Sequence, residues 1–339
     1  MKLMKTEDAV GQVLCHDITQ IIRGVTKAPV FRKGHIITKD DIQVLLSVGK
    51  DNIYIWEKDE SIFHENEAAA ILRDICLGKN MHGTEPSEGK IELIADRDGL
   101  FTVDEEHLHK VNGLGEMMIA TRHGNFSVRK GDKLAGTRII PLVIAKEKMA
   151  MARKAVGLKP LLNVLPFKKK NFGVVTTGNE IFYGRIQDTF TEVIQSKLRE
   201  FGGNMVEHVV LNDDYRKITL AIQKMLQDGV DMVFCTGGMS VDPDDQTPLA
   251  IKNTDARIVS YGAPVLPGAM FLLAYTMDGR PIVGLPGCVM YAGRTIFDLL
   301  LPRLMADVPI TEEDIIDLGQ GGLCLNCQVC TFPNCGFGK

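Results

Sequence analysis

Four cysteines lie close together near the C-terminal end of the sequence, at Cys324, Cys327, Cys330 and Cys335. Their spacing is C-x2-C-x2-C-x4-C, and they make up half of the eight cysteines in the chain. Thiolates are soft ligands, and four of them at this spacing can converge on one metal ion or iron–sulfur cluster. We therefore expect residues 311–339 to form a metal-binding tail.

The spacing leaves the kind of metal centre open. A bacterial ferredoxin cluster uses C-x2-C-x2-C-x3-C-P, whereas here the last gap is one residue longer and no proline follows Cys335. Structural zinc more often uses two separated C-x2-C pairs. We favour an iron–sulfur cluster over zinc and a metal over free thiols. The structural alternative is a closed zinc site that only pins the C-terminus.

Three glycine-containing loops follow expected strands further upstream. They span Thr176 to Glu180, Thr236 to Pro248 and Leu285 to Cys288. Such loops gather at the carboxyl edge of a parallel sheet, where ligands bind. Glycine lets the backbone approach a ligand and point its N–H groups at a phosphate. We therefore interpret the three loops as a site for a phosphorylated ligand, with carboxylates near its reactive end.

Each loop taken alone has a simpler explanation. Gly237-Gly238 resembles many glycine turns of α/β proteins, and the aspartates that follow it can serve only to cap the next helix. The occurrence of all three loops at equivalent strand ends favours a binding site.

The order of elements around these loops predicts an α/β fold. Strands are expected over 172–176, 205–211 and 230–235, with helices over 193–201 and 218–226 between them. This order predicts a three-layer, mostly parallel sheet with helices on both faces and right-handed crossovers. A hairpin over 271–285 and a helix over 290–301 complete the domain.

The chain length of 339 residues favours more than one domain. We expect an N-terminal segment over 1–60, a β-rich domain over 61–165, the α/β domain over 166–310 and the tail over 311–339. The first two segments together form an α+β or β-rich region. Within them we expect helices over 40–48, capped by Thr38, and over 66–78, a strand over 53–56, a hairpin over 91–103 and a small barrel or sandwich over 90–145.

The composition is that of an ordinary globular protein, with 45% apolar residues, 24% charged residues and a net charge of −4. This balance gives no general attraction to nucleic acid or to a membrane surface, and we expect neither as a partner. No apolar stretch approaches the ~20 residues of a membrane helix, and Met1 to Val10 lack the apolar core of a signal peptide. We expect a cytoplasmic protein with reduced cysteines, of which Cys15, Cys76 and Cys235 pack as small apolar side chains.

Residues 172–306 resemble the molybdopterin-binding domain that molybdopterin adenylyltransferases and molybdopterin molybdenumtransferases share. The N-terminal segment, through Val10-Gly11, Phe31 to Ile37 and Asp40-Asp41-Ile42, also resembles the start of the molybdenumtransferase. The resemblance of the α/β domain rests on this ordered set: Thr177-Gly178-Asn179-Glu180, Gly184 to Asp188, Asp213-Asp214, Thr236-Gly237-Gly238-Met239-Ser240 through Asp245, Pro267-Gly268 and Leu285-Pro286-Gly287.

The resemblance implies a site and a ligand. The loop over 236–240 would hold the terminal phosphate of the pterin or its AMP ester. Asp245 matches an aspartate implicated in turnover of adenylylated molybdopterin and in metal insertion, and Glu180 and Asp188 match other acidic positions. Such carboxylates could hold a metal ion such as Mg²⁺ on phosphates, or orient water or molybdate. The residues expected to bind molybdopterin, or its molybdenum-loaded form, are Thr177, Gly178, Thr236, Gly237, Gly238, Ser240, Pro286 and Gly287.

The sequence also departs from the family. Leu266 and Ala269 flank Pro267-Gly268 where the molybdenumtransferase typically has lysines, and Cys288 replaces an asparagine after Pro-Gly. Asn179 replaces the usual aspartate, and the cysteine tail stands in place of a C-terminal β domain.

Two hypotheses follow. The protein inserts molybdenum into the pterin dithiolene, or it is a non-catalytic carrier that delivers the cofactor to a molybdoenzyme client. A weaker third is hydrolysis or adenylylation of a nucleotide-like ligand. We expect a homo-oligomer, and the choice between molybdate and tungstate stays open.

Overall fold

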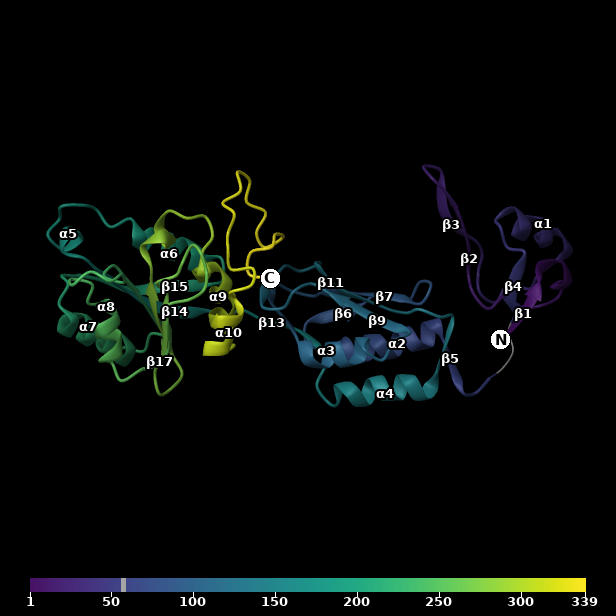
Figure 1. The fold of residues 1–339 in the computed structure, drawn as a ribbon, viewed down its shortest axis with the longest axis horizontal. Coiled ribbons are helices and arrows are strands. Elements are labelled where there is room, and N and C mark those ends of the chain that lie inside the picture. The colour runs from purple at the N-terminus through teal and green to yellow at the C-terminus, as the bar shows by residue number, and fades with distance from the viewer. Residues whose placement is uncertain (56–58) are drawn as a thin grey trace. The chain divides into compact units, whose positions relative to one another are not determined.

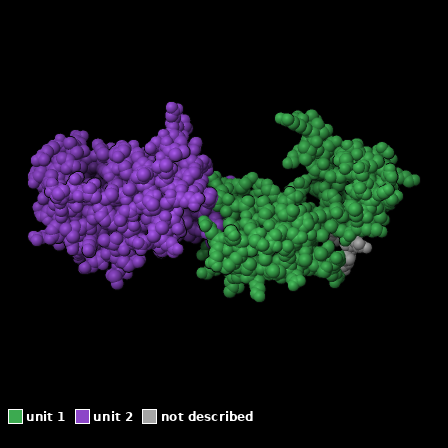
Figure 2. Space-filling model, viewed as in Figure 1, with its two compact units in different colours: residues 1–94, 104–122, 132–162 green, residues 95–103, 123–131, 163–339 purple. Residues whose placement is uncertain are grey.

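The computed structural model describes residues 1–55 and 59–339 (Figure 1). These residues form two compact units, coloured separately in Figure 2. Unit 1 contains residues 1–94, 104–122 and 132–162, and unit 2 contains residues 95–103, 123–131 and 163–339. Two short segments, 95–103 and 123–131, therefore belong to unit 2, and from residue 163 onward the whole chain belongs to it. The boundaries of the four expected segments stay a prediction.

A six-stranded sheet forms the centre of unit 2, in the order β15-β14-β16-β19-β18-β17. β14 pairs in parallel with β15 and β16, and β16 pairs in parallel with β19. β18 is antiparallel to both β19 and β17. The bounds are β14 Lys170–Thr177, β15 Gly203–Leu211, β16 Met232–Thr236, β17 Arg257–Tyr261, β18 Leu272–Tyr275 and β19 Pro281–Leu285.

Helices cover both faces of this sheet (Figure 1). α6 (Phe190–Arg199) and α9 (Ile296–Met305) share one apolar core, and α7 (Tyr215–Gln227) and α8 (Thr247–Lys252) share the other. Successive side chains of a strand point to opposite faces, so Phe172 and Val174 enter the first core and Val175 enters the second. The predicted three-layer, mostly parallel α/β fold is confirmed.

The expected hairpin over 91–103 is wrong, because its two strands belong to different sheets. β7 (Lys90–Ala95) pairs with β11 (Lys133–Ile139) in unit 1, whereas β8 (Gly99–Val103) pairs with β10 (Phe126–Val128) in unit 2. β10, β8 and β13 (Leu162–Leu165) form one three-stranded sheet.

The Asp98-Gly99 turn has another use in this arrangement. The Asp98 carboxylate accepts a hydrogen bond from the Lys130 backbone N–H at 2.8 Å. A Cβ atom on Gly99 would lie 2.4 Å from the Leu165 carbonyl oxygen, so only glycine permits this close approach.

Residues 1–55 form a small α+β part of unit 1. β1 (Lys2–Lys5) pairs with β4 (Asn52–Ile55), and β2 (Ile18–Ile22) pairs with β3 (Thr26–Phe31). Helix α1 (Lys39–Ser47) begins with a capping box between Thr38 and Asp41, as the sequence predicted. Trp56, expected at the end of the strand over 53–56, lies outside the described residues.

The remainder of unit 1 is an α+β arrangement, not the expected barrel or sandwich. A four-stranded sheet has the order β6-β7-β11-β9, and helix α2 packs against β11. The apolar face of α2 supplies Ala68, Leu72 and Ile75 to the interior, which a closed barrel would leave without a partner. The further bounds are β5 Ile62–His64, α2 Glu65–Cys76, β6 Met81–Gly83, α3 Glu105–Asn112, β9 Met117–Thr121, β12 Val143–Ala145 and α4 Lys146–Val156.

The C-terminal segment packs on unit 2. Helix α9 begins at Ile296, later than expected, because Thr295 and Asp298 form its capping box. Helix α10 (Glu312–Asp317) follows, and the tail then returns to the α6–α9 side of the sheet, where Phe337 is buried in the core. In the described part of the chain, no helix combines the length and the apolarity needed to cross a membrane.

Candidate functional site

The first two loops meet through the last residue of β14. Thr177 Oγ1 lies 3.1 Å from Thr247 Oγ1, and the Thr247 backbone N–H donates to the Gly238 carbonyl at 3.2 Å. A Cβ atom on Gly237 would lie 2.1 Å from the Thr177 carbonyl oxygen. Gly237 also has φ +82°, a conformation that side chains disfavour. The glycine at 237 is therefore required for the contact between the loops.

The loop over 236–240 is held from two further directions. The Met239 side chain is buried and lies so close to Gly284 of β19 that a Cβ there would be 2.6 Å from it. The Tyr261 hydroxyl donates to the Met239 and Ser240 carbonyls at 3.1 and 3.3 Å. β17 runs in the same direction as β19, which places Tyr261 at the carboxyl edge with the loops. Nothing in the sequence marked Tyr261 as part of this site.

The third loop presents open backbone at the same edge. Pro286 is buried, but Gly287 is exposed, and a Cβ atom added to it would meet no atom within 4 Å. Thr236, at the end of neighbouring β16, is fully buried, and its hydroxyl has no hydrogen-bond partner among the described residues. A buried hydroxyl of this kind needs a further polar partner. The carboxyl ends of β14, β16 and β19 thus fit a polar ligand.

Four carboxylates lie near one another beside the first loop. Asp213 accepts a hydrogen bond from the Asn179 backbone N–H at 2.9 Å. Burial raises the pKa of Asp213, and the charges of Glu180, Asp244 and Asp245 raise it further. Asp213 was part of the family pattern in the sequence but was not among the predicted site residues. The structure adds it to Glu180 and Asp245.

Asp245 also shapes its own loop. Its carboxylate accepts a hydrogen bond from the Asp242 backbone N–H at 3.0 Å, and its N–H donates to the Asp242 carbonyl at 2.9 Å. Asp245 is half-buried. Burial and the charge of Asp245 raise the pKa of Tyr261, so these two side chains also influence each other.

In the described part of the chain, Asp188 makes its hydrogen bonds around the start of α6 and not with the other predicted acidic residues. Its carboxylate accepts hydrogen bonds from the backbone N–H groups of Phe190 and Thr191 and from the hydroxyls of Thr191 and Thr176. His208 Nε2 lies 3.3 Å away. Burial opposes the charge, but these hydrogen bonds hold the pKa of Asp188 below its usual range. Asp188 therefore stabilises the start of α6.

The structure thus divides the predicted acidic residues. Within the described residues, no hydrogen bond or ion pair joins Asp188 to Glu180, Asp213 or Asp245. Thr176 and Thr177 point to opposite faces of β14, and Asp188 lies with Thr176. Cys288, beside Gly287, has a pKa raised by burial, which is typical of a packed thiol and not of a nucleophile.

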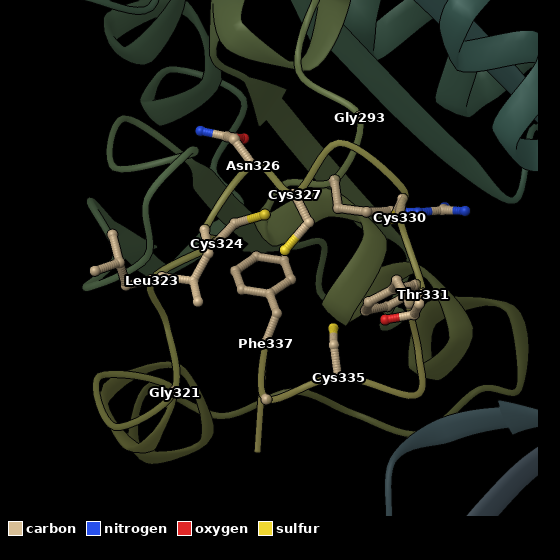
Figure 3. A pocket seen from close by; sticks show the side chains of 14 residues that line it. Gly293, Gly321, Leu323, Cys324, Asn326, Cys327, Cys330, Thr331, Cys335 and Phe337 are labelled. Carbon is tan, nitrogen blue, oxygen red and sulfur yellow. The ribbon is translucent and has the colours of Figure 1, made fainter.

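The four tail cysteines line one cavity of about 440 Å³ (Figure 3). The tail forms two arms, one that contains Cys324 and Asn326 and one that contains Cys330, Thr331 and Cys335. The sulfur atoms of Cys324, Cys327 and Cys335 point toward the space between these arms. Over residues 1–55 and 59–339, no three His, Cys, Asp or Glu side chains already lie close enough together to hold a metal ion.

Comparison with protein families agrees with this architecture. Residues 173–306 match the sequence profile of the family described as "Probable molybdopterin binding domain". Residues 173–306 belong to this molybdopterin-binding domain family. Residues 3–57 match a domain of unknown function, DUF8806. The resemblance found in the sequence is confirmed for the α/β domain, which links the chain to molybdenum cofactor biosynthesis.

Longer relatives are distant. The molybdopterin molybdenumtransferase of Staphylococcus epidermidis is 23% identical over 299 residues, which cover 83% of this chain and 65% of the relative. The molybdenum cofactor synthesis protein cinnamon of Drosophila melanogaster is 27% identical over 166 residues, or 46% of this chain and 27% of the relative. The chain therefore spans only part of the length of these relatives.

Among solved structures, the tungsten cofactor synthesizing protein MoaB of Pyrococcus furiosus is 21% identical. It covers 36% of this chain and 84% of its own, with a TM-score of 0.31.

Proposed function

We propose that the carboxyl ends of β14, β16 and β19 bind molybdopterin or its adenylylated form. The observation that supports this most strongly is the contact of Gly237 with the Thr177 carbonyl, which holds two glycine loops together at one sheet edge. Gly287 adds open backbone, and Thr236 adds a hydroxyl that has no hydrogen-bond partner among the described residues. Phosphate groups are bound by backbone N–H groups of this kind. The proposed contacts are those of Thr177, Gly178, Thr236, Gly237, Gly238, Ser240, Pro286 and Gly287.

The carboxylate group supports a reaction at this site. Because burial and three neighbouring charges raise the pKa of Asp213, the ionised group is destabilised without a cation. Mg²⁺ usually binds through one or two carboxylates together with substrate phosphates. Glu180, Asp213 and Asp245 could hold such an ion on the pterin phosphate. This arrangement favours insertion of molybdenum into the dithiolene, with molybdate as the substrate.

One observation favours a carrier instead. Leu266 takes the place of a lysine and forms a parallel bridge with Leu323 of the tail. The Leu266 N–H donates to the Gly322 carbonyl, and the Cys324 N–H donates to the Leu266 carbonyl, both at 2.8 Å. The side chain of residue 266 therefore offers an oxyanion no positive charge. A carrier would instead deliver the finished cofactor to a molybdoenzyme client.

The proposal includes three further parts. The four tail thiolates hold a metal centre, either an iron–sulfur cluster or zinc. The protein works in the reducing cytoplasm, and it forms a homo-oligomer. Light scattering after size exclusion tests the last part directly.

Ligand analysis of anaerobically purified protein tests the proposed function. Native mass spectrometry should find a pterin phosphate or its adenylyl ester bound to the chain, and elemental analysis for Mo and W identifies any loaded metal. A bound nucleotide without any pterin, or failure to take up added molybdopterin, would contradict the proposal.

A further inference from the structure

The two arms of the tail are closed into a loop at their base. The Gly338 backbone N–H donates to the Gly321 carbonyl at 2.9 Å. Phe337 is buried against the α9 core with only 4% of its surface exposed. These contacts bring Cys324 on one arm and Cys335 on the other to the same cavity. The tail is therefore an ordered part of unit 2.

The cavity has a largely apolar wall. Phe332 and Phe337 lie with their ring centroids 6.2 Å apart, and Leu323 completes one side. Cys324 and Cys335 are half-buried, whereas Cys327 and Cys330 are exposed. A metal centre here would be shielded from water on one side and accessible on the other, an environment that influences cluster potentials.

The volume of the cavity favours a cluster over a single zinc ion. Zn–S bonds of about 2.3 Å in a tetrahedron place the sulfur atoms only ~3.8 Å apart. The four cysteines line a cavity of about 440 Å³, which leaves room for a group of several atoms between them. A cluster distributes its thiolate ligands over several iron atoms, so its ligands stand further apart.

A cation lies in the wall of the cavity. The Arg294 side chain lines the cavity together with Cys330. It also donates to Asp298 Oδ1 at 2.9 Å and lies over the Phe332 ring at 4.9 Å. Hydrogen bonds and positive charge at cluster sulfurs stabilise the reduced, more negative state. Arg294 is thus placed to influence a redox centre.

We infer that Cys324, Cys327, Cys330 and Cys335 hold a [4Fe–4S] cluster, and that Arg294 is a positioning residue that raises its reduction potential. The first three cysteines have the C-x2-C-x2-C spacing of a ferredoxin cluster, and Cys335 follows after four further residues. This inference rests on the proposed metal centre of the tail and does not depend on pterin binding.

Metal and sulfide analysis of the full-length chain tests the cluster. Protein reconstituted anaerobically with ferrous iron and sulfide should contain about four iron and four sulfide per chain. Cys327→Ser should lose most of this iron, while Cys288→Ser, which changes a thiol outside the cavity, should retain it. Near-ultraviolet circular dichroism checks that both variants fold. One zinc per chain, two iron per chain, or no metal would overturn the cluster.

Redox titration followed by electron paramagnetic resonance tests Arg294. Arg294→Gln should keep its iron but show a more negative reduction potential, and Arg294→Lys should recover part of the change. Arg199→Gln removes an equal charge from the exposed end of α6 and should leave the potential unchanged. Equal potentials in wild type and Arg294→Gln would overturn the role of Arg294.

The proposed cluster and the proposed pterin binding can be tested independently of each other. Molybdopterin binding is measured on Cys327→Ser, whose substitution lies outside the three loops. Binding with the iron lost supports separate sites. Absence of pterin binding in wild type with the cluster present would contradict the proposed ligand while leaving the cluster intact.

Discussion

At the residue scale, the site depends on a few positions where backbone passes close to backbone. Gly237 is required because its Cα faces the Thr177 carbonyl, and Gly287 is free of such contacts. The sequence pattern identified both glycines, because the family motif includes them. It did not identify Tyr261, because a tyrosine at the end of an expected strand has no distinctive spacing. Only the pairing of β17 with β18 brings it to the glycine loop.

Asp245 separates the two candidate functions. Asp245→Asn keeps an oxygen that can accept the Asp242 N–H, so the loop should remain folded and the pterin should still bind. If the carboxylate positions a cation, loss of its charge should reduce molybdenum insertion by about 100-fold or more, measured by reconstitution of an apo-molybdoenzyme. Asp242→Asn, in the same turn, is the control. Normal insertion by Asp245→Asn would exclude the assigned role.

At the element scale, apolar patterns predicted the helices and strands of the α/β domain better than they predicted strand pairing. Helical spacing of apolar residues correctly indicated α6, through Val193 to Phe201, and α7, through Ile218 to Leu226. The predicted pairing of β7 with β8 was wrong. Alternation of apolar and polar residues shows that a segment is a strand, but it does not show which strand lies beside it. The contact of Gly99 with Leu165 and the bond of Asp98 to Lys130 join residues far apart in the sequence.

The start of α6 should depend on pH through Asp188. The folded pKa of Asp188 lies below its usual value, so its charge stabilises the fold above the unfolded pKa of about 3.9. This contribution is lost as the pH falls through the folded pKa. Asp188→Ala should therefore lower the free energy of unfolding by roughly 1 kcal/mol at neutral pH and by less at pH 3.

Urea titrations of both proteins at the two pH values measure this difference. Glu192→Ala, also in the first turn of α6, is the comparison. An unchanged difference between pH 7 and pH 3 would show that the Asp188 charge does not stabilise the helix.

At the scale of the whole molecule, unit 2 combines the molybdopterin-binding domain with the cysteine tail. The sequence indicated both parts, but we expected the domain over 166–310 and the tail over 311–339 to be separate segments. The bridge between Leu266 and Leu323 joins the tail to the loop residue before Pro267, and Arg294, which follows the Pro286-Gly287 loop, lies over the Phe332 ring of the tail. Neither contact has a local signal, because each joins residues from distant parts of the chain.

The most direct test of pterin binding is the affinity of Gly287→Ala for molybdopterin. The added methyl group meets no protein atom within 4 Å, so the variant should fold as wild type does. It would, however, separate the ligand from the backbone, and we predict binding weaker by about tenfold or more. Gly136→Ala in β11 of unit 1, where a Cβ would only contact the Lys90 side chain at 3.9 Å, should bind as wild type does. Equal affinity of wild type and Gly287→Ala would contradict a pterin site at the ends of β14, β16 and β19.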